Sequence, residues 1–362
     1  MTLGQAGIGR PRSLVRQTLH YFTRPHEGPI ATPITGPSAW RAADLKGTWR
    51  EPLNEAQRDE VRRAVEVAQS RQLPRHALTR RDFPLPTLRR DVERWRRTIL
   101  DGRGFVVLRG VPIESWSEDQ CETFFWCLGL HLGICGAQNP EGDLLGHVRD
   151  QRVEVEDVTL RAYRTRATIR FHCDAADAVG LLCLHGARSG GQSRIASSVA
   201  VFNLLLERAP ELVPLLFQPF HLDTKAEGGL RHFPITPCAY AGGRLRTFYH
   251  ADYFREAERH TTAPRLTADQ RRLLDLYDAI ADEICLEMDF EAGDVQLLSN
   301  HTIVHSRRGY EDDPDPTQRR HLLRLWLSFP EERPWRERWS MAKTTGRLLG
   351  SLARERLAQR HL

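Results

Sequence analysis

The stretch ATIRFHCD, residues 167–174, contains the pattern that decides the fold. It begins as an apolar, β-branched run typical of a strand and ends with His172 and Asp174. Because successive side chains of a strand point to opposite faces, His172 and Asp174 project to one side while Cys173 points away. This pair forms two thirds of a 2-His-1-carboxylate site for non-heme Fe(II). The alternative is that these residues are simply the polar end of a strand and bind no metal.

A third ligand must come from far along the chain. The segment SNHTIVHSRRGYED, residues 299–312, supplies His301 and His305. Both have the same strand parity, so side-chain alternation does not choose between them. The alternative without a ligand role is that one of them is a packed core histidine and the other is exposed.

The segment RRHLLRLWLSF, residues 319–329, is the last strong strand pattern. It places Arg320 and Arg324 on one face of a strongly apolar strand. Two arginines on such a face are costly to bury unless they meet anions. The alternative is a surface edge strand, and the apolar residues crowded into positions 322–329 argue against it.

The remaining pattern favours a β-sandwich or barrel decorated by helices over a doubly wound sheet. Short strand-like runs dominate from residue 150 onward, and helical periodicity interrupts them only at about 199–216 and 267–288. Before them, helices are expected at 53–71, 86–101 and 117–133, the first and last of them with N-terminal caps, and a buried strand is expected at 104–112. Residues 1–50 lack clear periodicity and predict a tail or a loosely docked arm.

Composition excludes several classes of protein. The 362 residues include 52 Lys+Arg and 47 Asp+Glu, a net charge of +5, and the arginines are spread along most of the chain rather than forming a nucleic-acid-binding stripe. The seven cysteines are odd in number and contain no C-x-x-C pair, which favours reduced thiols over a disulfide framework. Neither a membrane span nor a secretory signal is indicated. We therefore expect a cytoplasmic protein with neither a nucleic-acid nor a membrane partner.

Taken in order, the motifs are H-x-D, a Gly-Gly turn with a hydroxyl residue, a distal N-x-x-x-x-H, and R-x-x-x-R. This order resembles the taurine dioxygenase (TauD/TfdA) family of Fe(II)- and 2-oxoglutarate-dependent oxygenases, over roughly residues 100–330. The resemblance implies a mostly β fold with helical elaborations around a double-stranded β-helix, a jelly-roll or cupin-like core.

The same resemblance implies a division of the chain. Residues 1–50 would form an N-terminal arm, partly irregular, and 51–335 a single oxygenase domain. Within that domain we expect a helical outer layer at 51–102 and the β-helix core at about 103–335, with a lid insertion at about 223–290. Residues 336–362 would form a C-terminal helical tail.

Carried onto this sequence, the family motifs assign His172 and Asp174 to iron, and Asn300 selects His305, five residues on, as the third ligand. His301 would then support the site or pack. Ser193 in SGGQSRI, residues 189–195, stands where the family places a cosubstrate-binding threonine. Arg320 matches the arginine that pairs with the distal carboxylate of 2-oxoglutarate, and Arg324 a second arginine that reaches the primary substrate in some members. Which arginine takes which anion stays open.

The implied reaction uses Fe(II), 2-oxoglutarate and O2 to hydroxylate an aliphatic C–H bond of a small molecule, such as an amino acid or a natural-product intermediate, and releases succinate and CO2. Gln138 and Asn139, in the loop at 136–150, would orient the substrate together with Arg324. The carboxylate of Asp174 argues against the halogenating relatives. Desaturation, cyclisation or epimerisation at the same iron remain alternatives, as does a non-catalytic ligand-binding β-helix protein. The family resemblance also implies a homo-oligomer. The sequence does not identify the substrate or the position that is oxidised.

Overall fold

Two β-sheets form the centre of the protein in the computed structural model, which describes residues 11–47, 49–151, 165–225 and 231–330, with a few helical positions after residue 345. The larger sheet has the order β1-β2-β14-β6-β17-β3, with β4 also paired to β17. Its strands are β1 (Arg50–Pro52), β2 (Phe105–Arg109), β3 (Ile134–Gly136), β4 (Leu145–Val148), β6 (Ala178–His185), β14 (Val295–Ser299) and β17 (His321–Ser328).

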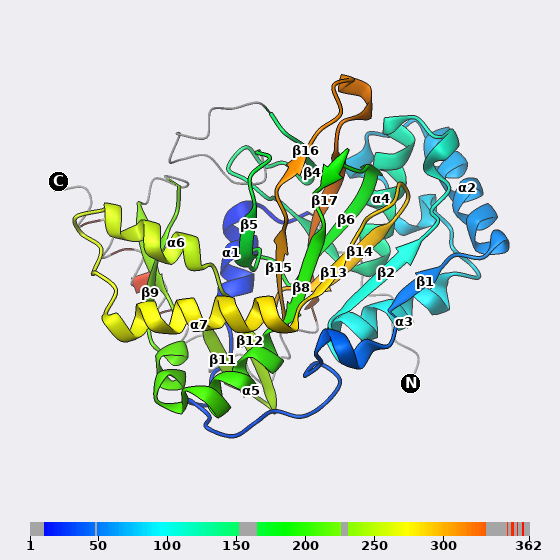
Figure 1. Ribbon diagram of the computed structural model, residues 1–362. Coiled ribbons are helices and arrows are strands. Elements are labelled where there is room, and N and C mark those ends of the chain that lie inside the picture. Colours follow the sequence, from blue (N-terminus) through cyan, green and yellow to red (C-terminus); the bar gives the residue numbers. More distant parts are fainter. Residues whose placement is uncertain are drawn as a thin grey trace.

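The smaller sheet has the order β13-β8-β15-β5. Its strands are β5 (Ile169–His172), β8 (Ser193–Ser197), β13 (Leu286–Met288) and β15 (Ile303–Arg307), and they lie beside the larger sheet (Figure 1). Phe105 and Val179 of the larger sheet share one buried apolar cluster with Ile195 and Ile303 of the smaller one. The sheets therefore pack face to face, and the predicted double-stranded β-helix is confirmed.

A helical layer covers the outer face of the larger sheet. It consists of α2 (Glu55–Ser70), α3 (Arg89–Leu100) and α4 (Glu118–Leu132), which gather around β1 and β2 in Figure 1. The sequence predicts all three. The N-terminal signals of α2 and α4 are local, because Asn54 accepts a hydrogen bond from the Gln57 backbone N–H and Ser117 caps α4 in the same way, whereas α3 has no side-chain cap. Their apolar faces meet alternate leucines of β17, at positions 323, 325 and 327.

A second group of helices packs outside the smaller sheet. It contains α5 (Ser198–Arg208), a 3-10 helix (Pro210–Phe217), α6 (Ala251–Glu256) and α7 (Ala268–Ile284). The predicted helix at 267–288 begins at its Thr267 cap but ends early, at Ile284, because residues 286–288 pair with β8 as strand β13. Pairing with a distant strand outweighs local helical periodicity there.

The described part of the region expected to form a lid includes two antiparallel strand pairs. The first pairs β9 (Phe220–Asp223) with β10 (His232–Ile235), and the second pairs β11 (Cys238–Ala241) with β12 (Arg244–Thr247). Two shorter strands, β7 (Ser189–Gly190) and β16 (Tyr310–Glu311), pair with each other. The lid role of 223–290 stays a prediction, and the helical tail expected at 336–362 lies almost wholly outside the described residues.

The described part of the N-terminal arm is tightly docked, where the sequence suggested loose attachment. Helix α1 (Leu14–Phe22) buries Gln17, His20 and Tyr21. Its side chains form hydrogen bonds with residues more than 150 positions away, so no local sequence pattern predicts that α1 packs against the core. None of the helices in the described residues is both long and apolar enough to cross a membrane.

Candidate active site

His172, Asp174 and His305 come together at the inner side of the smaller sheet. His172 ends β5, Asp174 follows it, and His305 lies directly opposite His172 in the antiparallel pair of β15 with β5. The two imidazole centroids are 4.2 Å apart, and His305 Nε2 is 3.8 Å from Asp174 Oδ2. One ligand atom from each residue lies within 4.8 Å of the other two. The three side chains can therefore hold one metal ion.

Backbone contacts orient this set. His172 Nδ1 lies 2.9 Å from the Arg170 carbonyl oxygen, so this nitrogen donates and Nε2 keeps its lone pair. The Asp174 backbone N–H donates to Asn300 Oδ1 at 3.1 Å, which gives the N-x-x-x-x-H motif a structural role. Cys173 is buried on the other side, with its Sγ directed at the backbone oxygens of Thr247 and Ile303. The expected alternation of these side chains is confirmed.

The electrostatics favour the forms that bind a metal. Burial alone would raise the pKa of Asp174, but the neighbouring charges of Arg324, His305 and His172 lower it to about 2. Burial, followed by the proximity of His172, lowers the pKa of His305 to about 3. At neutral pH the carboxylate is ionised and the His305 imidazole is neutral, as metal ligands must be.

Two buried polar atoms without hydrogen-bond partners indicate whether an iron ion fits between His172, Asp174 and His305. Asp174 Oδ2 and His305 Nδ1 are both buried without a hydrogen-bond partner. Buried polar atoms are normally paired, so each exception calls for a reason. A divalent cation would satisfy the carboxylate oxygen, and two imidazoles with one carboxylate are the donor set of non-heme Fe(II) sites with further coordination positions. The residues therefore fit the metal.

His301 lies in a different cluster. Its Nε2 is 2.9 Å from Asp177 Oδ1 and 2.8 Å from Arg24 Nη2, and its ring stacks on Tyr21. The described metal-binding group does not include it. The two histidines that strand parity could not distinguish are thus separated by their partners.

Two buried arginines, Arg320 and Arg307, form a positive region near the cluster of His172, Asp174 and His305. Arg320 has 5% of its surface exposed, and its guanidinium carbon lies 5.1 Å from the centroid of the Tyr310 ring. Arg307 lies 4.8 Å from the same centroid, and burial and the charge of Arg320 lower its pKa to about 10. Arg320 Nη1 and Arg307 Nε and Nη1 are buried without a hydrogen-bond partner. Two such cations are costly to bury unless an anion joins them.

Ser193 belongs to the same region. It lies directly opposite Arg307 in the pair of β15 with β8, and its Oγ is 3.4 Å from Gln296 Oε1. The turn that precedes it has Gly191 at φ +75°, where a Cβ would lie 3.3 Å from Arg320 Nε. Sequence analysis missed Arg307. The available signal was its position two residues after His305 on the same strand, which gives both side chains the same parity.

Gln138 positions Arg324 next to the Asp174 carboxylate. Arg324 Nε donates to Gln138 Oε1 at 2.7 Å, and Gln138 Nε2 donates to the Arg324 carbonyl oxygen at 2.9 Å. Arg324 Nη1 then lies 3.7 Å from Asp174 Oδ1. Asn139 instead uses both amide atoms within its loop, on Asp143 Oδ2 and the Asp143 backbone N–H. Of the two predicted amides, only Gln138 contacts a residue of the site.

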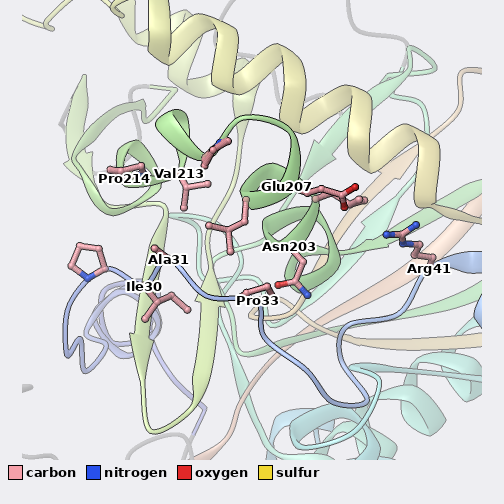
Figure 2. Close-up of a pocket in the computed structure, with 12 residues that line it drawn as sticks. Ile30, Ala31, Pro33, Arg41, Asn203, Glu207, Val213 and Pro214 are labelled. Carbon is pink, nitrogen blue, oxygen red and sulfur yellow. The ribbon is translucent and has the colours of Figure 1, made fainter.

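A surface cavity of about 540 Å³ lies elsewhere (Figure 2). It is formed by the arm around Ile30 and Pro33 and by helix α5 with the 3-10 helix that follows it. Its lining includes Asn203, Glu207 and Arg41 but none of the predicted metal or cosubstrate residues. This cavity is therefore separate from the candidate active site.

Comparisons with known proteins agree with the fold and with the family resemblance. Residues 69–326 match the taurine catabolism dioxygenase TauD, TfdA family. FR-33289 synthase of Streptomyces rubellomurinus is 31% identical over 86% of this chain and 96% of its own length, and the taurine hydroxylase-like protein SAT17 of Stachybotrys chartarum is 29% identical over 78% and 76%.

Solved structures show the same fold. An asparagine oxygenase with Fe(II), 2S,3S-3-hydroxyasparagine and succinate superposes with a TM-score of 0.63 at 18% identity, over 77% of this chain and 93% of that one. The non-heme iron oxygenase OrfP with Fe, succinate and (3S)-hydroxy-L-Arg gives 0.58 at 17% identity, over 80% and 96%.

The chain belongs to the TauD/TfdA family. It is an Fe(II)- and 2-oxoglutarate-dependent dioxygenase, as the order of its motifs predicted, and it acts on a small molecule. The predicted cofactor set of Fe(II), 2-oxoglutarate and O2 is confirmed, and the non-catalytic alternative is not favoured.

Proposed function

We propose that His172, Asp174 and His305 bind Fe(II), and that the enzyme hydroxylates an aliphatic C–H bond of a small anionic molecule. The observation that carries this proposal is the buried Asp174 oxygen without a hydrogen-bond partner, opposed by two imidazoles within ligand distance. When bound with 2-oxoglutarate and O2, the iron supplies the oxidising chemistry. The remaining residues bind, orient and exclude water.

The distal carboxylate of 2-oxoglutarate pairs with Arg320 and Arg307 in this proposal. Both guanidiniums carry buried N–H groups without a hydrogen-bond partner, and both face Tyr310. A planar guanidinium suits a carboxylate through two parallel hydrogen bonds. The Ser193 hydroxyl, opposite Arg307, adds a short donor to the same region. These contacts support Arg320, the first of the two predicted arginines, as the one that serves the cosubstrate.

Arg324 then serves the primary substrate. Gln138 holds its Nε, and its Nη1 lies on the side of Asp174, next to the iron-binding atoms. A substrate carboxylate or comparable anion paired there would lie within reach of the metal. The two solved structures contain hydroxylated amino acids, 2S,3S-3-hydroxyasparagine in one and (3S)-hydroxy-L-Arg in the other. FR-33289 synthase is a relative in sequence. We infer an amino acid or a natural-product intermediate as the substrate.

The test is an anaerobic titration of the metal-free chain with Fe(II) and 2-oxoglutarate, followed through the weak visible charge-transfer band of the chelate. The unmodified chain should show the band, and His305→Ala should lose it. His301→Gln is the matched control: it changes the other candidate histidine and keeps a donor toward Asp177, so the band should remain.

Loss of the band in His301→Gln with retention in His305→Ala would overturn the ligand assignment.

The reaction type is tested separately with substrate candidates. Hydroxylation adds one oxygen atom per succinate formed, whereas desaturation or cyclisation removes two hydrogens and epimerisation leaves the mass unchanged. We also propose a cytoplasmic location, supported by seven free cysteines.

A further inference from the structure

A second set of two histidines and a carboxylate lies on the opposite face of the larger sheet. It consists of Glu118 in the first turn of α4, His147 on β4 and His321 at the start of β17, and we name these three residues the outer histidine cluster. Strand pairing places His147 opposite Leu323, the residue two positions after His321. His321 therefore points toward α4, away from the face that carries Arg320 and Arg324.

The distances within the outer histidine cluster match a tetrahedral metal site. His147 Nδ1 is 2.9 Å from His321 Nε2 and 3.7 Å from Glu118 Oε1, and one ligand atom from each residue lies within 4.8 Å of the others. Ligands that bind zinc at 2.0–2.1 Å stand about 3.3 Å apart in a tetrahedral arrangement. The observed separations lie on both sides of this value, so small side-chain rotations would suffice.

A further carboxylate supports the geometry independently. Glu122 follows Glu118 by four residues, which places it on the same face of α4. Its Oε1 is 3.6 Å from His147 Nε2, the ring nitrogen opposite the one that faces His321 and Glu118, and its side chain is 14% exposed. Metal-bound histidines characteristically present their second ring nitrogen to a carboxylate, which fixes the tautomer. Glu122 also pairs with Arg75 at 2.5 Å, so it is held in place.

We propose that the outer histidine cluster binds a divalent transition metal of the Zn²⁺ type, independently of the catalytic iron. Two imidazole nitrogens and one carboxylate oxygen are ligands that zinc prefers, and water completes the tetrahedron. His321 is buried, His147 is half-buried, and Glu118 is exposed, so an ion can reach the site from solvent. The bound ion links helix α4 to strands β4 and β17, next to the segment that carries Arg320.

The test is a Zn²⁺ titration of the chelator-treated full chain, by calorimetry with metal analysis of the dialysed protein. The unmodified chain should bind two equivalents. His172→Gln, which disables the iron-binding set, should retain one equivalent, and addition of Zn²⁺ should raise the thermal unfolding midpoint of this variant. In His172→Gln/His147→Gln the remaining equivalent should bind about a hundredfold more weakly or be lost, together with the rise in midpoint.

Controls separate this site from other effects. His76 is exposed and outside both clusters, so His172→Gln/His76→Gln should still bind one equivalent. If the His147 variant does not fold, His172→Gln/Glu118→Gln replaces it, because Glu118 is exposed. The remaining Zn²⁺ equivalent should bind more weakly in that variant too. The single variant His147→Gln should keep the charge-transfer band of the iron chelate. A single equivalent in the unmodified chain, or an unaltered second equivalent in both outer-cluster variants, would refute the proposal.

Discussion

Asp174 and Asp177 are three residues apart, and each is surrounded by two histidines and one arginine, yet the two environments are opposites. Asp174 meets His305 Nε2 and Arg324 Nη1 only at 3.8 and 3.7 Å, and its Oδ2 has no hydrogen-bond partner. Asp177 is fully paired. Its Oδ1 accepts from Arg24 at 2.6 Å and faces His301 Nε2 at 2.9 Å, and its Oδ2 accepts from the Phe329 backbone N–H at 2.7 Å and faces His20 Nε2 at 2.5 Å.

The difference shows how one residue set can serve two purposes. Direct hydrogen bonds consume the acceptor capacity of Asp177, and they fasten α1 and the arm to the core. The distances around Asp174 are those of ligands that share an ion rather than a proton. We therefore expect Asp174 to determine activity and Asp177 to determine stability, and the predictions below test this separation.

Asp174→Ala should give the largest effect, on activity. Removal of a ligand from a three-ligand iron set should lower the rate of succinate formation coupled to substrate oxidation by at least about a thousandfold, or roughly 4 kcal/mol. The free energy of unfolding should change by no more than about 1 kcal/mol, because no short side-chain hydrogen bond is lost. Turnover assays and urea unfolding measure the two quantities, and substantial turnover by the variant would contradict the assignment.

Asp177→Asn should show the reverse pattern. The neutral amide leaves Arg24 buried without its counter-charge, so the free energy of unfolding should fall by about 3–5 kcal/mol. Limited proteolysis should then cut within residues 11–47 faster than in the unmodified chain. The intensity of the Fe(II)–2-oxoglutarate band per folded molecule should be retained. A variant as stable as the parent would show that the arm is held by other contacts.

A third carboxylate, the half-buried Asp278, extends the comparison to the pH dependence of stability. Burial raises its pKa from 3.8 to about 6, although Tyr249 donates to it at 2.8 Å and Arg255 and Arg170 stand 3.7 Å away. The pKa of Asp278 is higher in the folded state than in the unfolded state, so its protonated form stabilises the fold. This contribution to the free energy of unfolding is fully present below about pH 4 and is lost as the pH rises through about 6.

Asp278→Asn removes this dependence. The variant should be about as stable as the unmodified chain at pH 4. At pH 7 its free energy of unfolding should exceed that of the unmodified chain by about 3 kcal/mol. Urea unfolding at several pH values measures the difference. A constant difference across the range would mean that the cations near Asp278 compensate its burial as fully as those near Asp177.

Arg320→Gln tests whether the iron-binding set and the cosubstrate region are separable. Loss of a charge-assisted pair should raise the 2-oxoglutarate concentration at half-maximal chelate absorbance about a hundredfold, equivalent to roughly 2.7 kcal/mol. Fe(II) binding without cosubstrate should change less than about threefold, because the guanidinium is remote from the ligands. Arg324→Gln is the matched comparison: it should raise the KM of the primary substrate instead. The reverse pattern would exchange the two assignments.

The sequence predicts the parts of this molecule whose signals are local or alternate along a strand. The caps of α2 and α4, the shared face of His172 and Asp174, and the opposite faces of β17 all follow from periodicity. The fold class and the iron chemistry followed from the order of motifs.

Other features depend on which distant segments meet. The docking of α1 depends on Asp177, and the environment of Arg307 depends on the strand register that sets it opposite Ser193. The outer histidine cluster needs three elements together, and no one of its residues is distinctive in the sequence. Tertiary pairing of this kind leaves no local period to detect.

Tyr21→Phe should give the smallest effect and tests whether the two aspartate environments communicate. The Tyr21 hydroxyl donates to the Asn300 carbonyl oxygen at 2.8 Å, its ring stacks on His301, and Asn300 in turn holds the Asp174 backbone. Loss of one buried hydrogen bond should lower the free energy of unfolding by about 1 kcal/mol. If the arm also positions Asp174, half-maximal formation of the iron chelate should require a few times more Fe(II), by about threefold. Tyr240→Phe, at a half-buried position of β11, should change neither quantity. Altered stability with unaltered iron binding would show that the network around Asp177 anchors the arm without shaping the iron-binding set.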